Sequence, residues 1–154
     1  MNNGTEGSAI RLETPAAGDL FEGPVRRLTL ARMLAFSGGS FDSPRWPQAN
    51  LHTDAGKARE FGLASIIASG TQSEGILLGL MVSLFGRDWH RKGVLDAKMT
   101  SSVYVNDTIQ AKARLESRDV KPEGEHFVLE VWCENGHGEK IIVGQAEATL
   151  DLSN

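Results

Sequence analysis

The chain has 154 residues, the length of a single domain, and can bury a hydrophobic core without the support of disulfides. Its formal net charge of −4 and its isoelectric point near 5.6 argue against a nucleic-acid-binding protein, which usually carries a basic surface. The single cysteine, Cys133, excludes an internal disulfide and fits a reducing compartment.

The apolar runs of the chain are shorter than the roughly 20 residues that a membrane-spanning helix needs. The N-terminus is polar and lacks the apolar region of a secretory signal, so we expect a cytoplasmic protein without a membrane partner. Residues 1–17 are rich in Asn, Gly, Ser and Pro and are predicted to form a flexible arm. Residues 18–154 are predicted to form one domain.

Helical periodicity and cap residues dominate the first half of the domain. Thr29 is a suitable N-cap, Gly38-Gly39 a suitable helix end, and Thr53 or Asp54 a suitable cap for a second helix. These signals predict a strand at 20–21, helices over 30–37 and 55–61 separated by a long polar loop, and a helix over 71–85. The last helix is apolar on most sides, which predicts a buried helix.

Alternation of apolar and polar residues dominates the second half and indicates half-buried strands. It predicts strands over 98–105, 109–116, 127–134 and 142–150, with a turn at Asn135-Gly136. The charged stretch over 87–92 is interpreted as a solvated loop anchored by Trp89. An apolar helix is most economically buried inside a curved antiparallel sheet. The sequence therefore predicts an α+β fold in which such a sheet wraps around the helix over 71–85.

Two features in the first half could serve acid–base and carbonyl chemistry. His52 follows the long loop, and an imidazole titrates near neutrality, as general acid–base catalysis requires. Ser69-Gly70 opens the buried helix, where free backbone N–H groups can stabilise a carbonyl oxygen that gains negative charge. Taken alone, His52 could equally be a loop-packing residue, and Ser69 an ordinary N-cap.

The carboxylates near His52 in sequence are Asp42, which lies in the loop, and Asp54, which we interpret as a helix cap. Glu74 lies one turn into the buried helix and would have to be paired or have a raised pKa. Asn50 could orient a ligand or form a turn. The other histidines and Cys133 do not have metal-ligand spacing, so we expect neither a metal nor a cofactor.

These motifs together resemble those of the MaoC-like hot-dog hydratases and dehydratases, which include the (R)-specific enoyl-CoA hydratases. The resemblance covers nearly the whole chain from Gly18. It is carried by Gly18-Asp19-Leu20-Phe21, Thr29 to Gly38, Asn50-Leu51-His52-Thr53-Asp54, Ile67-Ala68-Ser69-Gly70, Val105-Asn106-Asp107-Thr108-Ile109 and Val143-Gly144-Gln145-Ala146.

The resemblance implies a hot-dog fold, a homodimer or higher homo-oligomer, and water addition to a 2-enoyl thioester of CoA or a carrier protein. In that family an Asp and a His activate water, and a backbone N–H polarises the thioester carbonyl. By motif position the histidine is His52 and the N–H donor is Gly70. The usual Ser-Gly-Asp reads Ser37-Gly38-Gly39 here, so the catalytic Asp is absent from its place.

The absent carboxylate leaves three possibilities: Asp42 replaces it, His52 acts alone, or the subunit binds an acyl thioester or a catalytic partner without turnover. We expect a hydratase or dehydratase with His52, Gly70 and Asp42 as catalytic residues. The residues expected to contact the substrate are Ser69, Asn50, Thr71 and Trp46. The alternatives are an acyl-CoA thioesterase that uses Glu74, and a non-catalytic subunit of a heteromeric dehydratase.

Overall fold

The computed structural model describes residues 15–151, so most of the predicted arm, residues 1–14, lies outside it, as do residues 152–154. Its elements are β1 (Leu20–Glu22), β2 (Arg26–Arg27), α1 (Leu30–Ser37), α2 (Ala55–Glu60), α3 (Gly70–Phe85), α4 (Arg87–Lys92), β3 (Val94–Met99), β4 (Thr108–Lys121), β5 (Gly124–Asn135) and β6 (Lys140–Leu150). None of the helices within the described residues is long and apolar enough to cross a membrane.

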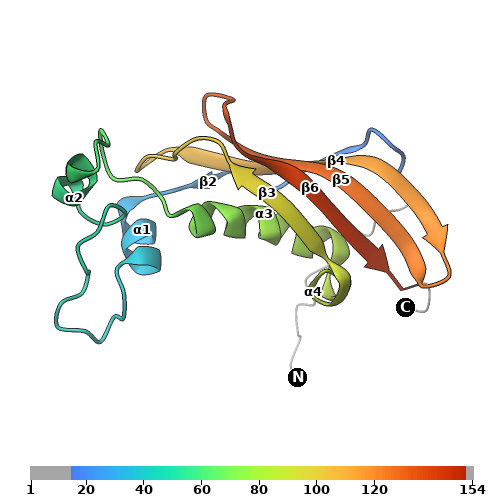
Figure 1. Cartoon of the computed structure of the whole chain (residues 1–154), viewed down its shortest axis with the longest axis horizontal. Helices are drawn as coiled ribbons and strands as arrows, with labels where there is room; N and C mark the ends of the chain where they lie inside the picture. Colours follow the sequence, from blue (N-terminus) through green and yellow to red (C-terminus); the bar gives the residue numbers. More distant parts are fainter. Residues whose placement is uncertain (1–14, 152–154) are drawn as a thin grey trace, which may run out of the picture.

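All strands belong to one antiparallel sheet with the order β1-β4-β5-β6-β3, and β2 also pairs with β4. Helix α3 runs beneath this sheet, while α1 and α2 extend beyond one end of it (Figure 1). The predicted α+β class, with a curved antiparallel sheet around a central apolar helix, is confirmed.

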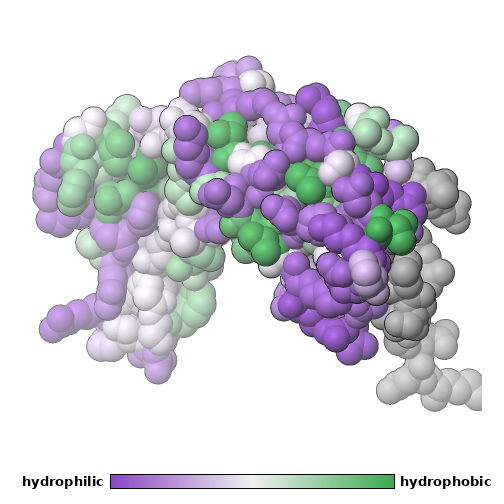
Figure 2. Space-filling view, turned by 45° about the vertical axis from the view of Figure 1, so that its right-hand side comes forward, coloured by the Kyte–Doolittle hydropathy of each residue, from purple (hydrophilic) through white to green (hydrophobic). Residues whose placement is uncertain are grey.

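The core lies between α3 and the inner face of the sheet. On β4, Ile109, Ala111, Ala113 and Leu115 are buried, and on α3 the buried residues include Leu77 and Met81. The intervening β4 residues face outward and form ion pairs with neighbouring strands, which gives the sheet the largely hydrophilic outer surface visible in Figure 2. The buried inner face and the charged outer face of β4 correspond to the alternation of apolar and polar residues in the sequence.

Helix α3 is less enclosed than its composition predicts. Its sheet-facing side is buried, but Gly75 and Gly79 on the other side are exposed, and within the described residues no atom lies within 4 Å of a Cβ added at either position. The view in Figure 2 shows the molecule hollowed between two projecting parts below the sheet. Although α3 is apolar on most sides, it therefore keeps an open side in this chain.

The two short helices begin where the cap residues predict. The Thr29 hydroxyl accepts a hydrogen bond from Arg32 N at 3.4 Å, and the Asp54 carboxylate accepts one from Lys57 N at 2.8 Å. Each bond satisfies an N–H group that has no partner within its helix. The Asp54 cap lies at the end of the loop that contains His52, whereas the Thr29 cap lies at the start of α1, the helix that precedes this loop.

Two local predictions were wrong. Residues 87–92 form α4 instead of a solvated loop, and Asp88 is buried, although Trp89 is buried as expected of an anchor. The strand predicted over 98–105 ends at Met99, as part of β3. Its second half instead pairs with residues 66–68: Ala68 N donates to Val103 O at 2.8 Å, and Val105 N donates to Ile66 O at 3.0 Å.

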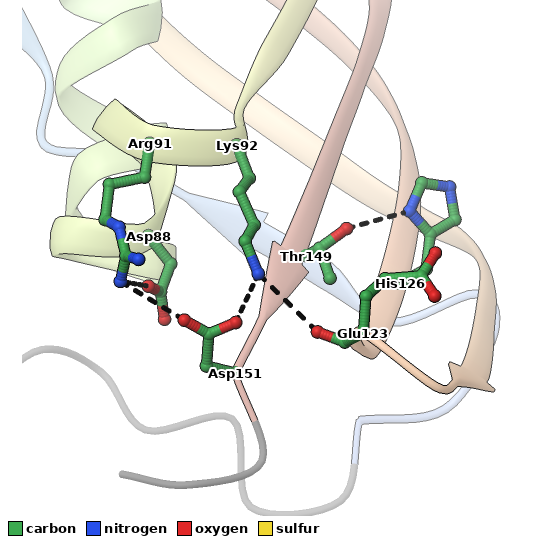
Figure 3. Close-up of polar contacts among 7 residues, drawn as sticks. All are labelled: Asp88, Arg91, Lys92, Glu123, His126, Thr149 and Asp151. Carbon is green, nitrogen blue, oxygen red and sulfur yellow. Dashed lines mark hydrogen bonds and ion pairs between the residues drawn. The ribbon is translucent and has the colours of Figure 1, made fainter.

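Helix α4 is attached to the end of β6 by ion pairs (Figure 3). Arg91 Nη1 lies 3.2 Å from Asp151 Oδ2, and Lys92 pairs with the other oxygen of the same carboxylate. Lys92 also donates to the Glu123 carbonyl in the β4–β5 turn at 3.5 Å. The Lys92 hydrogen bond and the nearby positive charges hold the pKa of Asp151 below its ordinary value.

Candidate active site

His52 is held in one orientation by two hydrogen bonds. Its backbone N–H donates to Asn50 Oδ1 at 2.8 Å, and its ring Nδ1 lies 3.0 Å from the carbonyl oxygen of Ile67. A carbonyl oxygen only accepts hydrogen bonds, so the neutral ring carries its proton on Nδ1. Nε2 is then the atom with the free lone pair, which is the state that a general base requires.

Hydrogen bonds between side chains and backbone groups stabilise the loop before His52. Asn50 Nδ2 donates to Ser37 O at 2.9 Å and to Gln48 O at 3.2 Å. The Thr53 hydroxyl donates to Gln48 O at 2.7 Å and accepts from Asn50 N at 2.9 Å. Asn50 is predicted from the sequence to contact the substrate. In the structure its side-chain amide is instead hydrogen-bonded to the end of α1 and to its own loop. Its place in this structure is that of a positioning residue for His52.

The N-terminus of α3 leaves free N–H groups beside His52. Ser69 is the N-cap, but its hydroxyl contacts that of Thr71 at 2.9 Å and does not cap the helix. The first intrahelical bonds are those of Gln72 N and Ser73 N to Ser69 O. Within residues 15–151 the N–H of Gly70 has no acceptor. It is therefore available, together with the positive end of the helix dipole, for a ligand oxygen.

His52 and Gly70 line the same cavity, which has a volume of about 330 Å³. The pairing of residues 66–68 with 103–105 brings the start of α3 next to the segment that follows β3. The rest of the wall is formed by Ile67, Ala68, Ser73, Met99, Thr100, Ser101, Ser102, Val103, Ile141 and Ile142. Among residues 15–151, His52 is the only titratable side chain in this wall, and no aspartate or glutamate of this range belongs to it.

Glycine at position 70 allows a close contact with Met99. A Cβ atom added to Gly70 would overlap the sulfur of Met99, the last residue of the edge strand β3. The Met99 side chain is half exposed and covers the start of α3. Because its thioether is flexible, it can move when a larger group occupies this space.

The other predicted site residues lie outside the cavity wall. Asp42 is exposed in the loop, where its carboxylate accepts a hydrogen bond from the Ser40 hydroxyl. Trp46 packs on Phe41 with ring centroids 5.1 Å apart, and its buried indole N–H has no hydrogen-bond partner in the described part of the chain. Ser69 and Thr71 adjoin Gly70 at the mouth, and Glu74 lies on α3 but not in the wall.

One wall residue, Ser73, is missed by the sequence analysis. It lies three positions after Gly70 and is buried on the cavity side of α3. The signal that could have found it is a polar residue on the same helical face as the free N–H groups, since residues three apart share a face. Within the described residues, no group of three or more His, Cys, Asp or Glu side chains is arranged to hold a metal ion.

Comparisons with known proteins identify the family to which the chain belongs. Residues 21–139 match the family model described as the MaoC like domain. The chain belongs to the MaoC-like domain family. No curated protein is significantly similar to it in sequence.

Solved structures of MaoC-like proteins share its hot-dog fold. A MaoC-like dehydratase from Rhodospirillum rubrum superposes with a TM-score of 0.69 at 20% identity, covering 91% of this chain and 95% of that chain. The (R)-hydratase from A. caviae involved in PHA biosynthesis gives 0.67 at 17% identity, covering 90% and 98%. A chain of the ChsH1-ChsH2 complex from Mycobacterium tuberculosis gives 0.66 at 13% identity, covering 89% and 99%.

Proposed function

We propose that this MaoC-like protein catalyses the reversible addition of water to a 2-enoyl thioester of CoA or a carrier protein. The observation that carries the proposal is a single cavity that contains both the free Nε2 of His52 and the free N–H of Gly70. Hydration of an activated double bond needs a base for water and a donor for the thioester oxygen.

The reaction can be written with His52 as the only proton carrier. In hydration, an O–H bond of water breaks and its proton passes to Nε2, while the oxygen bonds to Cβ. The electron pair of the double bond moves through Cα to the thioester oxygen, where the Gly70 N–H stabilises the charge. When the enolate collapses, Nε2 returns the proton to Cα. Dehydration is the reverse.

The Ile67 carbonyl helps one imidazole to act first as a base and then as an acid. It accepts the Nδ1 proton at 3.0 Å in the resting state, and it stabilises the imidazolium while Nε2 holds the second proton. The wall contains no carboxylate to share the task. The proposal therefore gives Asp42 no role in the chemistry.

A second copy of the chain is expected along β3. This strand pairs with β6 on one side, and its other edge is unpaired within the described residues. It also exposes Val94 and Met99. Pairing of two β3 strands would remove the open edge and extend the sheet across both subunits. Light scattering of the purified protein tests this, and a monomer at micromolar concentration would contradict it.

The test of function is loss of conjugated-enoyl absorbance with a panel of trans-2-enoyl-CoA thioesters. We expect activity in the wild type, its loss in His52→Gln, and little change in Asp42→Asn, which serves as the matched control. A thiol reagent in a parallel reaction should detect no free CoA. Release of CoA would instead indicate a thioesterase, and retained hydration in His52→Gln would refute the proposed base.

The absence of a carboxylate from the wall also favours a second candidate, a subunit that binds an acyl thioester within a heteromeric dehydratase. This candidate predicts that the pure protein binds acyl-CoA but hydrates no member of the panel. It further predicts turnover when the chain is combined with a related chain that carries a cavity carboxylate, and that this turnover survives His52→Gln.

A further inference from the structure

The hydroxyl of Ser73 has no hydrogen-bond partner in the described part of the chain, although the residue as a whole is buried beside the cavity. The residue is 5% exposed and belongs to the cavity wall with His52 and Gly70. Serine inside a helix usually bonds to a carbonyl of the preceding turn, as Ser83 does with Leu80 O at 2.7 Å on the same helix. Ser73 makes no such bond, so its hydroxyl keeps its full capacity to donate and accept hydrogen bonds.

Other hydroxyls of the wall are already engaged. Thr100 donates to Lys140 O at 2.7 Å, and Ser101 donates to the Glu139 carboxylate at 2.5 Å. Ser102 is exposed at the rim. Ser73 is thus a wall residue of low exposure whose hydroxyl is available to a ligand.

The position of Ser73 relative to Gly70 suggests which part of the ligand it meets. The two residues are three apart, so they lie on one face of α3, separated by about 4.5 Å along the helix axis. A thioester carbonyl held at Gly70 would direct the next two carbons of the acyl chain along the wall that contains Ser73. The hydroxyl is then close to substituents on Cβ.

We propose that Ser73 binds the oxygen at Cβ, which is the attacking water in hydration and the 3-hydroxyl group in dehydration. The assignment rests on the proposed function. The thioester oxygen is served by Gly70, and the proton on the Cβ oxygen is directed to His52. What remains is a lone pair on that oxygen, which a serine hydroxyl can bind as a donor.

This contact assists the reaction without proton exchange at Ser73. In dehydration, the Cα–H bond breaks and its proton passes to Nε2 of His52. The Cβ–O bond then breaks with its electron pair on oxygen, and Nε2 returns the proton so that water leaves. The Ser73 hydrogen bond stabilises the oxygen while it carries negative charge. Ser73 and His52 together hold the Cβ oxygen in one orientation, so the site selects one configuration at Cβ.

The test compares binding of 3-hydroxybutyryl-CoA and butyryl-CoA by calorimetry. The measurements use His52→Gln, which blocks turnover, alone and combined with Ser73→Ala, Ser73→Thr or Ser83→Ala. The measured quantity is the preference for the 3-hydroxy thioester, the ratio of the two Kd values. We expect Ser73→Ala to reduce this preference roughly three- to tenfold, the range for one neutral hydrogen bond, with butyryl-CoA affinity retained.

The control variants separate the hydroxyl from a general effect on α3. Ser83→Ala removes a hydroxyl from the same helix outside the cavity and should leave the preference unchanged, while Ser73→Thr keeps the hydroxyl and should preserve it. An unchanged preference in Ser73→Ala overturns the assignment and leaves the proposed function standing. Failure of the wild-type protein to bind butyryl-CoA overturns the proposed function, and the assignment with it.

Discussion

Replacing Asn50 with alanine tests how the structure orients its general base. The substitution removes three hydrogen bonds, those to Ser37 O, Gln48 O and His52 N, with lengths of 2.9, 3.2 and 2.8 Å. Each neutral bond contributes about 0.5–1.5 kcal/mol, and the longest of the three, which is exposed, belongs at the lower end. We expect the free energy of unfolding to fall by about 2 kcal/mol, which corresponds to a Tm about 4–8 °C lower.

The same substitution should also lower the turnover of the fully folded protein. Without the bond to its backbone N–H, His52 loses one of its two anchors, and small displacements of a catalytic group are costly. We expect kcat/KM to fall at least about tenfold. The assays are urea unfolding followed by circular dichroism and hydration of an enoyl thioester at a temperature where the variant is fully folded.

Asn135→Ala is the matched control. Asn135 also makes three hydrogen bonds, to His137 N, Glu139 N and the Glu139 carboxylate at 3.0, 3.0 and 3.1 Å, but in the β5–β6 turn. It should lose similar stability and keep full activity per folded molecule. A loss below about 0.5 kcal/mol in Asn50→Ala would refute the hydrogen-bond argument. Equal activities in the two variants would refute the orientation of His52 by Asn50.

Three further predictions follow from other contacts. Gly70→Ala should reduce turnover because the new Cβ and the displaced Met99 side chain occupy the part of the cavity next to the start of α3. Adding Met99→Ala to this variant should restore turnover, and full activity of Gly70→Ala alone would contradict the argument. Asp151→Asn should lower the free energy of unfolding at pH 7, because the lowered pKa of Asp151 contributes stability while its carboxylate is ionised. This contribution is lost as the carboxylate protonates, so the urea curves of variant and wild type should converge below pH 3.8. Burial raises the pKa of the Cys133 thiol to about 12, so a thiol reagent at pH 8 should label it only after unfolding, and rapid labelling of native protein would contradict its burial.

Much of the fold is predictable because it depends on local pattern. The alternation in β4 and β5 reports which side chains face the core, and the caps Thr29 and Asp54 satisfy backbone groups within three residues of themselves. Such signals need no knowledge of distant contacts. They therefore give the strands, the helix starts and the α+β class directly from the sequence.

The two errors concern segments whose structure is decided by distant residues. Helix α4 has the charge of a solvated loop, but the burial of Trp89 against Phe85 and the contacts of Arg91 and Lys92 with Asp151 stabilise it. The strand predicted over 98–105 changes partner at its centre, from β6 to residues 66–68. Neither the partner of a segment nor a change of partner is encoded in its periodicity.

The candidate site is predictable only where a motif names a residue. The motif positions of His52 and Gly70 indicate two residues that the structure places in one wall. The position of Asp42 depends on the path of a long loop, which no local signal determines, and the structure places it outside the wall. Ser73 stands between the polar residues Gln72 and Glu74, so polarity alone does not single it out, and the structure is needed to show that it lies in the wall.

A wall with a single titratable side chain has a consequence for the reaction. If Nε2 of His52 both removes the proton of water and delivers it to Cα, the two new bonds form on the same face of the double bond. The proton on Cα is then the one that came from the attacking water. The fixed Nδ1 proton, bound to Ile67 O, keeps Nε2 in position through both transfers. Syn addition is thus what the proposed mechanism requires of a cavity that lacks a carboxylate, and anti addition would require a second acid that this wall does not contain.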